Sequence, residues 1–182
     1  MKKNDVAARA LFDGAFGKGE REAQRRWSRR RSRDPARLER LLLDHIPAEY
    51  HARIEAVPFF FLATSNSRGQ CDCSFKGGGP GLVRVLDTRT LAFPDFSGNQ
   101  LFMSLGNVLE NPHVGLLFID FEDGSRLRVN GLASIHDAGP PLELFPEAPR
   151  VVIVDIEEVT PNCAAYVPRL RPVHHANEDH QK

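Results

Sequence analysis

The feature that most constrains the fold is a series of short strand-like segments, separated by turn residues, that begins after Pro58. Helical spacing of apolar residues gives way there to continuous apolar runs and strict alternation, both typical of β-strands. One helix is expected among them, from about Asn99 to Glu110, because its apolar residues recur at helical spacing and an Asn-Pro pair follows it. The strands are expected at residues 59–64, 71–75, 83–86, 90–93, 114–120, 126–135 and 151–159. This pattern predicts a mainly β (α+β) fold built on an antiparallel barrel, since a parallel α/β sheet would need more helices.

In two of these segments, the sequence pattern predicts which faces of the strand are buried. Residues 59–64 form a continuous apolar run, which is typical of a strand that is buried on both faces. Residues 126–135 alternate instead, so Leu127 and Val129 are expected on one face and Arg126 and Arg128 on the other.

Two short amphipathic helices are expected before the barrel. An Asp-Pro pair at residues 34–35 is suited to begin the first, whose apolar stripe runs from Leu38 to His45. The second carries Ile46, Tyr50 and Ile54 at four-residue spacing. Their apolar stripes need a partner, and the barrel wall is the expected one.

An arginine-rich stretch occupies residues 18–40. One interpretation is an arm that touches RNA or a membrane. The other is a solvated helical face or an extension without fixed structure, which the interspersed acids and the absence of a stacking platform favour. We therefore divide the chain into an Arg-rich extension (1–34), a barrel domain with leading helices (35–170) and a polar tail (171–182).

Composition narrows the class of protein further. The formal net charge of the 182 residues is zero, which gives no overall field toward nucleic acid or an anionic membrane. No apolar run is long enough to span a bilayer, and the charged N-terminus does not resemble a secretory signal. Three cysteines do not make a disulfide framework. The expectation is a cytoplasmic protein with reduced thiols.

Several short motifs follow one another in a fixed order within residues 59–135. They are Ser-Phe-Lys at 74–76, Gly-Leu-Val-Arg-Val-Leu-Asp at 81–87, Leu-Ala-Phe-Pro-Asp at 91–95, Gly-Asn at 98–99, Asn-Pro-His-Val-Gly-Leu-Leu-Phe at 111–118 and Leu-Arg-Val-Asn-Gly at 127–131. Together they resemble the pyridoxamine 5'-phosphate oxidase-like superfamily, and most closely a subfamily of uncharacterised oxidase-related flavoproteins. The resemblance covers roughly residues 41–170. It implies a split β-barrel that binds FMN, and a homodimer in which each site is built from two chains.

The resemblance also implies which residues contact the cofactor. Lys76, beside Ser74, matches the position of a basic phosphate ligand, Arg126 matches a position at the flavin ring, and Arg128 matches one near the cofactor or the partner subunit. Asn99 is expected near the phosphate because it stands at the start of the predicted helix, where free N–H groups favour an anion. The full set of expected cofactor-binding residues is Ser74, Lys76, Pro94, Asp95, Asn99, Gln100, Ser104, Asn107, Arg126 and Arg128. A catalytic acid, base or nucleophile is not expected, because the protein would supply orientation and charge to the flavin.

Each of these residues has an ordinary structural explanation when it is taken alone. Lys76 beside a glycine run is typical of an exposed loop, and arginines on an alternating strand are typical of a wet sheet face. Asn99 after a glycine is typical of a helix cap. Their joint order, rather than any single residue, favours the flavin interpretation.

The chain departs from the family pattern in three places. Gln100 stands where a basic residue is usual, and Arg84 is a possible substitute. Glycines at 77–79 replace an acidic loop, which implies a more open substrate side. The C-terminal substrate residues of true pyridoxamine 5'-phosphate oxidases have no clear match, so oxidation of vitamin B6 does not follow.

Other chemistries have little support in the sequence. Cys71 and Cys73 alternate around Asp72 without a second ligand pair, which favours strand thiols over a metal site. Serine-elbow, zinc-protease and P-loop motifs do not occur. Two functions remain: an FMN-dependent oxidoreductase acting on an unidentified small molecule, or a flavin- or ligand-binding module for storage or sensing.

Overall fold

The computed structural model describes residues 16–28, 41–162 and 165–171. Its helices are α2 (Lys18–Trp27), α4 (Ala48–Ala56) and α5 (Met103–Glu110), with a 3-10 helix, η1, at Pro140–Leu144. Its strands are β1 (Phe59–Ser65), β2 (Cys71–Gly77), β3 (Arg84–Asp87), β4 (Thr90–Asp95), β5 (His113–Ile119), β6 (Arg126–His136) and β7 (Arg150–Asn162). All seven predicted strands are confirmed, and the α+β prediction with them.

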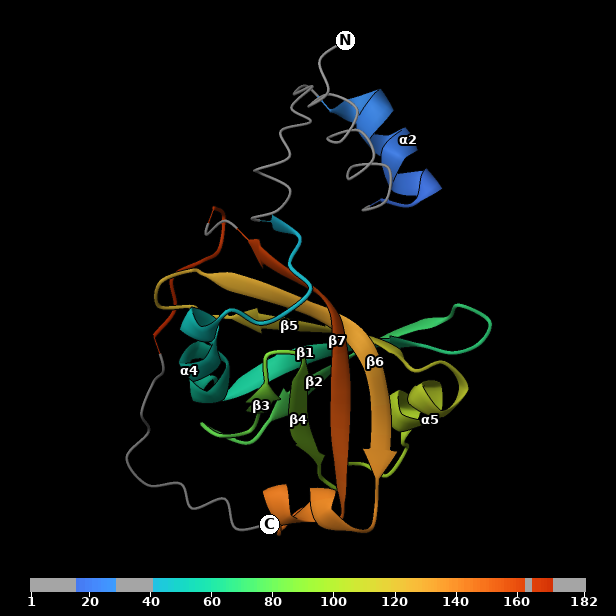
Figure 1. Ribbon diagram of the computed structural model, residues 1–182, viewed down its shortest axis with the longest axis vertical. Helices are drawn as coiled ribbons and strands as arrows, with labels where there is room; N and C mark the ends of the chain where they lie inside the picture. Colours follow the sequence, from blue (N-terminus) through green and yellow to red (C-terminus); the bar gives the residue numbers. More distant parts are fainter. Residues whose placement is uncertain (1–15, 29–40, 163–164, 172–182) are drawn as a thin grey trace.

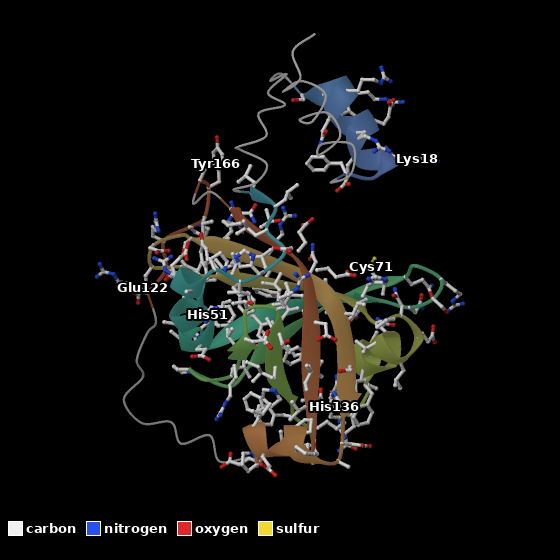
Figure 2. All side chains as sticks on the ribbon, in the orientation of Figure 1. Lys18, His51, Cys71, Glu122, His136 and Tyr166 are labelled. Carbon is white, nitrogen blue, oxygen red and sulfur yellow. The ribbon has the colours of Figure 1, made fainter. Side chains whose placement is uncertain are left out.

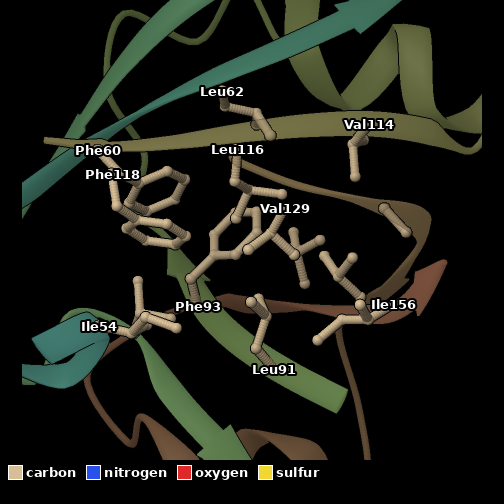
Figure 3. Close-up of a cluster of buried hydrophobic side chains, with 14 of the residues drawn as sticks. Ile54, Phe60, Leu62, Leu91, Phe93, Val114, Leu116, Phe118, Val129 and Ile156 are labelled. Carbon is tan, nitrogen blue, oxygen red and sulfur yellow. The ribbon is translucent and has the colours of Figure 1, made fainter. Parts of the chain in front are cut away.

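The seven strands form one antiparallel sheet in the order β2-β1-β5-β6-β7-β4-β3 (Figure 1). The sheet is rolled rather than flat. Phe60 of β1 lies edge to face against Phe93 of β4, with ring centroids 5.1 Å apart, although three strands separate β1 from β4 in the sheet order. Figure 3 shows these rings with Phe118 and Leu91 in the enclosed core. The predicted antiparallel barrel is therefore confirmed.

One predicted leading helix is confirmed and the other is partly wrong. Helix α4 buries Ile54 in the core, as its four-residue spacing predicts. Residues 34–40 of the first predicted helix lie outside the described residues. Its expected end is not helical, because the backbone of Leu43 exchanges two hydrogen bonds with Val159 of β7. Pairing with a strand end satisfies these groups and overrides the leucine periodicity.

Helix α5 begins at Met103, so the prediction that Asn99 lies at its start is wrong. Gly98, Gln100 and Phe102 have left-handed backbone conformations, with φ of 44°, 62° and 51°. A right-handed helix cannot contain such residues. The segment before α5 is therefore a tight irregular loop, and the helix is four residues shorter than predicted.

The two faces of β1 differ in this chain. Phe60, Leu62 and Thr64 are buried, whereas Phe59 and Phe61 are only half-buried. The prediction that this strand is buried on both faces is therefore wrong for the single chain. On the outer side, Phe59, Phe61, Phe75 and Phe121 form an aromatic cluster with centroid distances of 5.1 to 6.2 Å. We call this cluster the outer aromatic face.

The helices of the described ranges can be compared with the length and apolar character of a membrane-spanning helix. None of them combines the length and the apolar character that crossing a bilayer requires.

Candidate functional site

A cavity of about 330 Å³ lies between β2, the loop that follows β4 and the first turn of α5. Six of the ten predicted cofactor-binding residues line it. They are Ser74, Lys76, Asp95, Asn99, Gln100 and Ser104. The structure therefore brings together residues that are up to 30 positions apart in the sequence. Cys71, labelled in Figure 2, marks the beginning of the strand that forms one wall.

Strand alternation places three polar side chains of β2 toward this cavity. Asp72, Ser74 and Lys76 are half-buried, and the residues between them are exposed. Lys76 is directly opposite the buried Phe60 of β1, and directly opposite residues share a face of an antiparallel pair. Lys76 therefore projects toward the side of the sheet on which the core lies.

A chain of hydrogen bonds links β2 to α5 inside the cavity. The Ser104 hydroxyl donates to the Asp72 carboxylate over 3.2 Å, and the Ser74 and Ser104 hydroxyl oxygens are 3.0 Å apart. Ser104 is buried, which makes this pairing the expected way to satisfy its hydroxyl. Asp72 lines the cavity but was not predicted as a site residue. Its alternation with Ser74 and Lys76 is the sequence signal that could have found it.

The loop and the helix start contribute backbone groups. The Leu101 N–H donates to the side-chain oxygen of Asn99 over 3.1 Å, so Asn99 stabilises the loop rather than capping α5. Phe102 is the N-cap residue and makes no side-chain cap hydrogen bond. The N–H groups of the first helical turn lack intrahelical partners and carry the positive end of the helix dipole. With Lys76, they make this side of the cavity suited to an anion.

The negative charge of Asp95 is compensated within the barrel. The Arg150 Nε donates to the Asp95 carboxylate over 3.0 Å, and both side chains are largely buried. The same guanidinium lies 5.0 Å from the ring centroid of Phe102. Arg150 was not predicted, because only the β4–β7 register places it opposite Asp95. No local sequence pattern could have revealed this pairing.

The other four predicted residues do not line this cavity. Pro94 pairs with Val151 within the sheet, and the Asn107 amide donates to Thr64 over 3.0 Å, which anchors α5 on β1. Arg128 is directly opposite Leu117, which is opposite Phe61, so Arg128 lies on the outer side of the sheet. Arg126 alternates with Leu127 and shares that side. One chain therefore presents Lys76 and the two arginines on opposite sides of the sheet.

Two further residues named in the sequence analysis lie elsewhere. Arg84 is exposed on β3, and its guanidinium lies 5.2 Å from the ring centroid of Phe145. Arg84 does not line the cavity beside Lys76, so its position does not support a role as the substitute phosphate contact. Cys71 and Cys73 are exposed free thiols.

A second, larger cavity of about 610 Å³ lies between α4, the β5–β6 turn and residues 170–171. Phe59, Phe118 and Phe121 give it an aromatic lining, and Arg126 reaches it from β6. Glu122, which also lines it, and His51 of α4 mark this end of the barrel in Figure 2.

Comparison with known proteins identifies the family of this chain. The model of the family described as pyridoxamine 5'-phosphate oxidase matches residues 46–163, more than half of the chain. The chain belongs to this family. The match begins just before α4 and ends just after β7, so it contains the whole sheet and all residues that line the cavity beside Lys76. The predicted family membership is confirmed.

Solved structures agree with the fold of the pyridoxamine 5'-phosphate oxidase family. A protein from Lactobacillus delbrueckii, provisionally named a pyridoxamine 5'-phosphate oxidase, is 23% identical, with a TM-score of 0.52 over 64% of this chain and 94% of that one. HupZ of Group A Streptococcus is 19% identical, with a TM-score of 0.52 over 63% of this chain and 92% of that one. No curated protein matches the chain. At these identities, the likeness concerns the fold alone.

Proposed function

We propose that this protein binds FMN and is an FMN-dependent oxidoreductase that acts on a small molecule. The observation that carries the proposal is the convergence of Lys76, the Ser74–Ser104 hydroxyl pair and the first turn of α5 on one cavity, in a chain that belongs to the pyridoxamine 5'-phosphate oxidase family. When bound, a flavin supplies reversible hydride transfer. The residues of this chain would bind and orient it.

The cavity residues fit a phosphate group. The Lys76 ammonium supplies a cation, and the free N–H groups at the start of α5 supply donors along the helix dipole. Arg150 offsets the charge of Asp95, which would otherwise repel an anion. The end of the cavity near Lys76 and α5 is therefore the proposed phosphate position.

We also propose that the functional unit is a homodimer. Arg126 and Arg128 lie on the opposite side of the sheet from Lys76, so a site that uses both sets needs two chains. The outer aromatic face supports this arrangement, because Phe75 leaves 61% of its surface exposed beside two half-buried phenylalanines. Apolar surface of this kind is typical of an interface.

Flavin binding is tested with the purified protein and FMN. We expect reconstitution to give a flavin absorption band and a measurable Kd. Lys76→Ala should weaken FMN binding by about tenfold or more, since it removes a charge-assisted contact to the phosphate. Lys18→Ala, an exposed lysine on α2, is the matched control and should bind FMN like the parent protein. No FMN uptake by the parent protein would refute the proposal.

Turnover is tested separately from binding. Anaerobic mixing of the FMN-loaded protein with reduced nicotinamide or photoreduced deazaflavin should bleach the flavin band. FMN that stays bound and oxidised with every donor would contradict the oxidoreductase proposal and favour a storage or sensing module.

A further inference from the structure

Asp72 determines the direction of the hydrogen bonds inside the cavity beside Lys76. As a carboxylate it can only accept, so the Ser104 hydroxyl donates its single proton to Asp72. Ser104 then has only lone pairs left for Ser74, 3.0 Å away. Ser74 must therefore donate its own proton to Ser104. The chain of donation runs from Ser74 through Ser104 to Asp72.

This direction leaves both hydroxyls with lone pairs, and no protons, for a ligand. An ionised phosphate is likewise an acceptor only, so it cannot form a hydrogen bond with either serine in this state. The negative charge of Asp72 also opposes a second anion nearby. A ligand hydroxyl can donate to these lone pairs. The cavity therefore has a donor end, formed by Lys76 and the first turn of α5, and an acceptor side, formed by Ser74 and Ser104.

We infer that Asp72 is a positioning residue that makes Ser74 and Ser104 the receptor for the hydroxyl groups of a polyol chain. The inference rests on the proposed FMN site. It assigns the acceptor side to the ribityl hydroxyls and leaves the phosphate to Lys76 and α5. It replaces the expectation that Ser74 contacts the phosphate. Asp72 acts through Ser104 and needs no direct contact with the ligand.

The test compares three flavins that differ in their side chains: FMN, riboflavin without the phosphate, and lumiflavin without the polyol chain. Their Kd values are measured by fluorescence for the parent protein, Asp72→Ala and Ser104→Ala. We expect each variant to bind FMN and riboflavin about fivefold to tenfold more weakly, by the same factor for both. Lumiflavin binding should stay unchanged in both variants, which a merely structural role of Asp72 would not produce. Cys73→Ala, on the opposite face of β2, is the matched control and should bind all three like the parent protein.

The outcomes separate this inference from the proposed function. If Asp72→Ala tightens FMN binding and leaves riboflavin unchanged, Ser74 serves the phosphate and the inference is wrong, while FMN binding stands. Unchanged Kd values for FMN and riboflavin in both variants would overturn it equally. If the parent protein binds no flavin, both proposals fail. Ser104→Ala keeps the carboxylate and removes both the link to Asp72 and one receptor hydroxyl, so its effect on FMN and riboflavin binding still tests the acceptor side if Asp72→Ala does not fold.

Discussion

At the scale of single residues, Gly131 shows how closely the barrel strands approach one another. A Cβ atom at this position would lie 2.2 Å from the backbone oxygen of Asp155 on β7. The register of β6 and β7 shifts at this point, between Asn130 and Gly131. Because the obstructing atom belongs to the backbone, a side chain cannot be accommodated by rotating a neighbour.

Gly131→Ala should therefore destabilise the protein by about 2–3 kcal/mol, as overpacking of a closed core does. Urea unfolding followed by circular dichroism measures the difference. Gly106→Ala is the matched control, because no atom outside the backbone of its own helix and its chain neighbours lies within 4 Å of the added Cβ. On the exposed surface of α5 this change should stabilise by about 0.5–1 kcal/mol. Equal stability of Gly131→Ala and the parent protein would show that β6 and β7 can separate at this point.

Local sequence patterns could predict only those parts of the candidate site that depend on neighbouring residues in the chain. Strand alternation is a local property, and it suffices to place Ser74 and Lys76 on one face. The pairing of Asp95 with Arg150 depends instead on which strands neighbour each other, across 55 positions of the chain. Asp72 is an intermediate case: its face was predictable, but its hydrogen bond to Ser104 depends on how α5 packs.

At the scale of elements, α5 is held in place through polar contacts at its C-terminal end. The Glu110 carboxylate accepts hydrogen bonds from the Ser67 hydroxyl over 2.8 Å and from the Ser67 N–H over 3.1 Å. Asn111, which follows the helix, donates to the Ser65 hydroxyl of β1 over 2.9 Å.

Apolar periodicity alone did not predict where α5 begins. The left-handed residues of the preceding loop are set by the path of that loop from β4 to the helix.

The contact between Glu110 and Ser67 should be visible in a titration. The Ser67 hydroxyl, followed by its N–H, holds the pKa of the Glu110 carboxyl below its usual value. A lowered pKa in the folded protein means that ionised Glu110 favours folding above its unfolded pKa, and that this contribution is lost as pH falls through the folded pKa.

Replacing Ser67 by alanine removes the larger of the two causes. In a carboxyl ¹³C NMR titration, Ser67→Ala should move the pKa of Glu110 upward toward its usual value. Ser134→Ala, on β6, removes a hydroxyl that bonds to His136 and should leave the Glu110 titration unchanged. An unaltered Glu110 curve in Ser67→Ala would mean that this contact does not persist in solution.

At the scale of the whole molecule, the two sides of the sheet have different partners. The inner side is filled by the barrel core, which includes Phe60, Leu62 and Phe93. The outer side carries the outer aromatic face and has no such core within the described residues. The strand pattern was predictable, because strand periods are short and repeated. The outer side of β1, which was predicted to be buried, is only half-buried in one chain, and the proposed homodimer would bury it.

The proposed homodimer is tested at Phe61, which belongs to the outer aromatic face and lines neither cavity. A carboxylate placed there should oppose burial against a second copy, since an unpaired charge is costly to bury. We expect sedimentation equilibrium to give about twice the 20.4 kDa chain mass for the parent protein and the single-chain mass for Phe61→Glu. Leu109→Glu is the control, because Leu109 is 79% exposed on α5 and does not belong to the outer aromatic face. If Leu109→Glu is monomeric and Phe61→Glu is dimeric, the interface lies on α5 instead. A monomeric parent protein would refute the homodimer, and Arg126 and Arg128 would then act apart from Lys76.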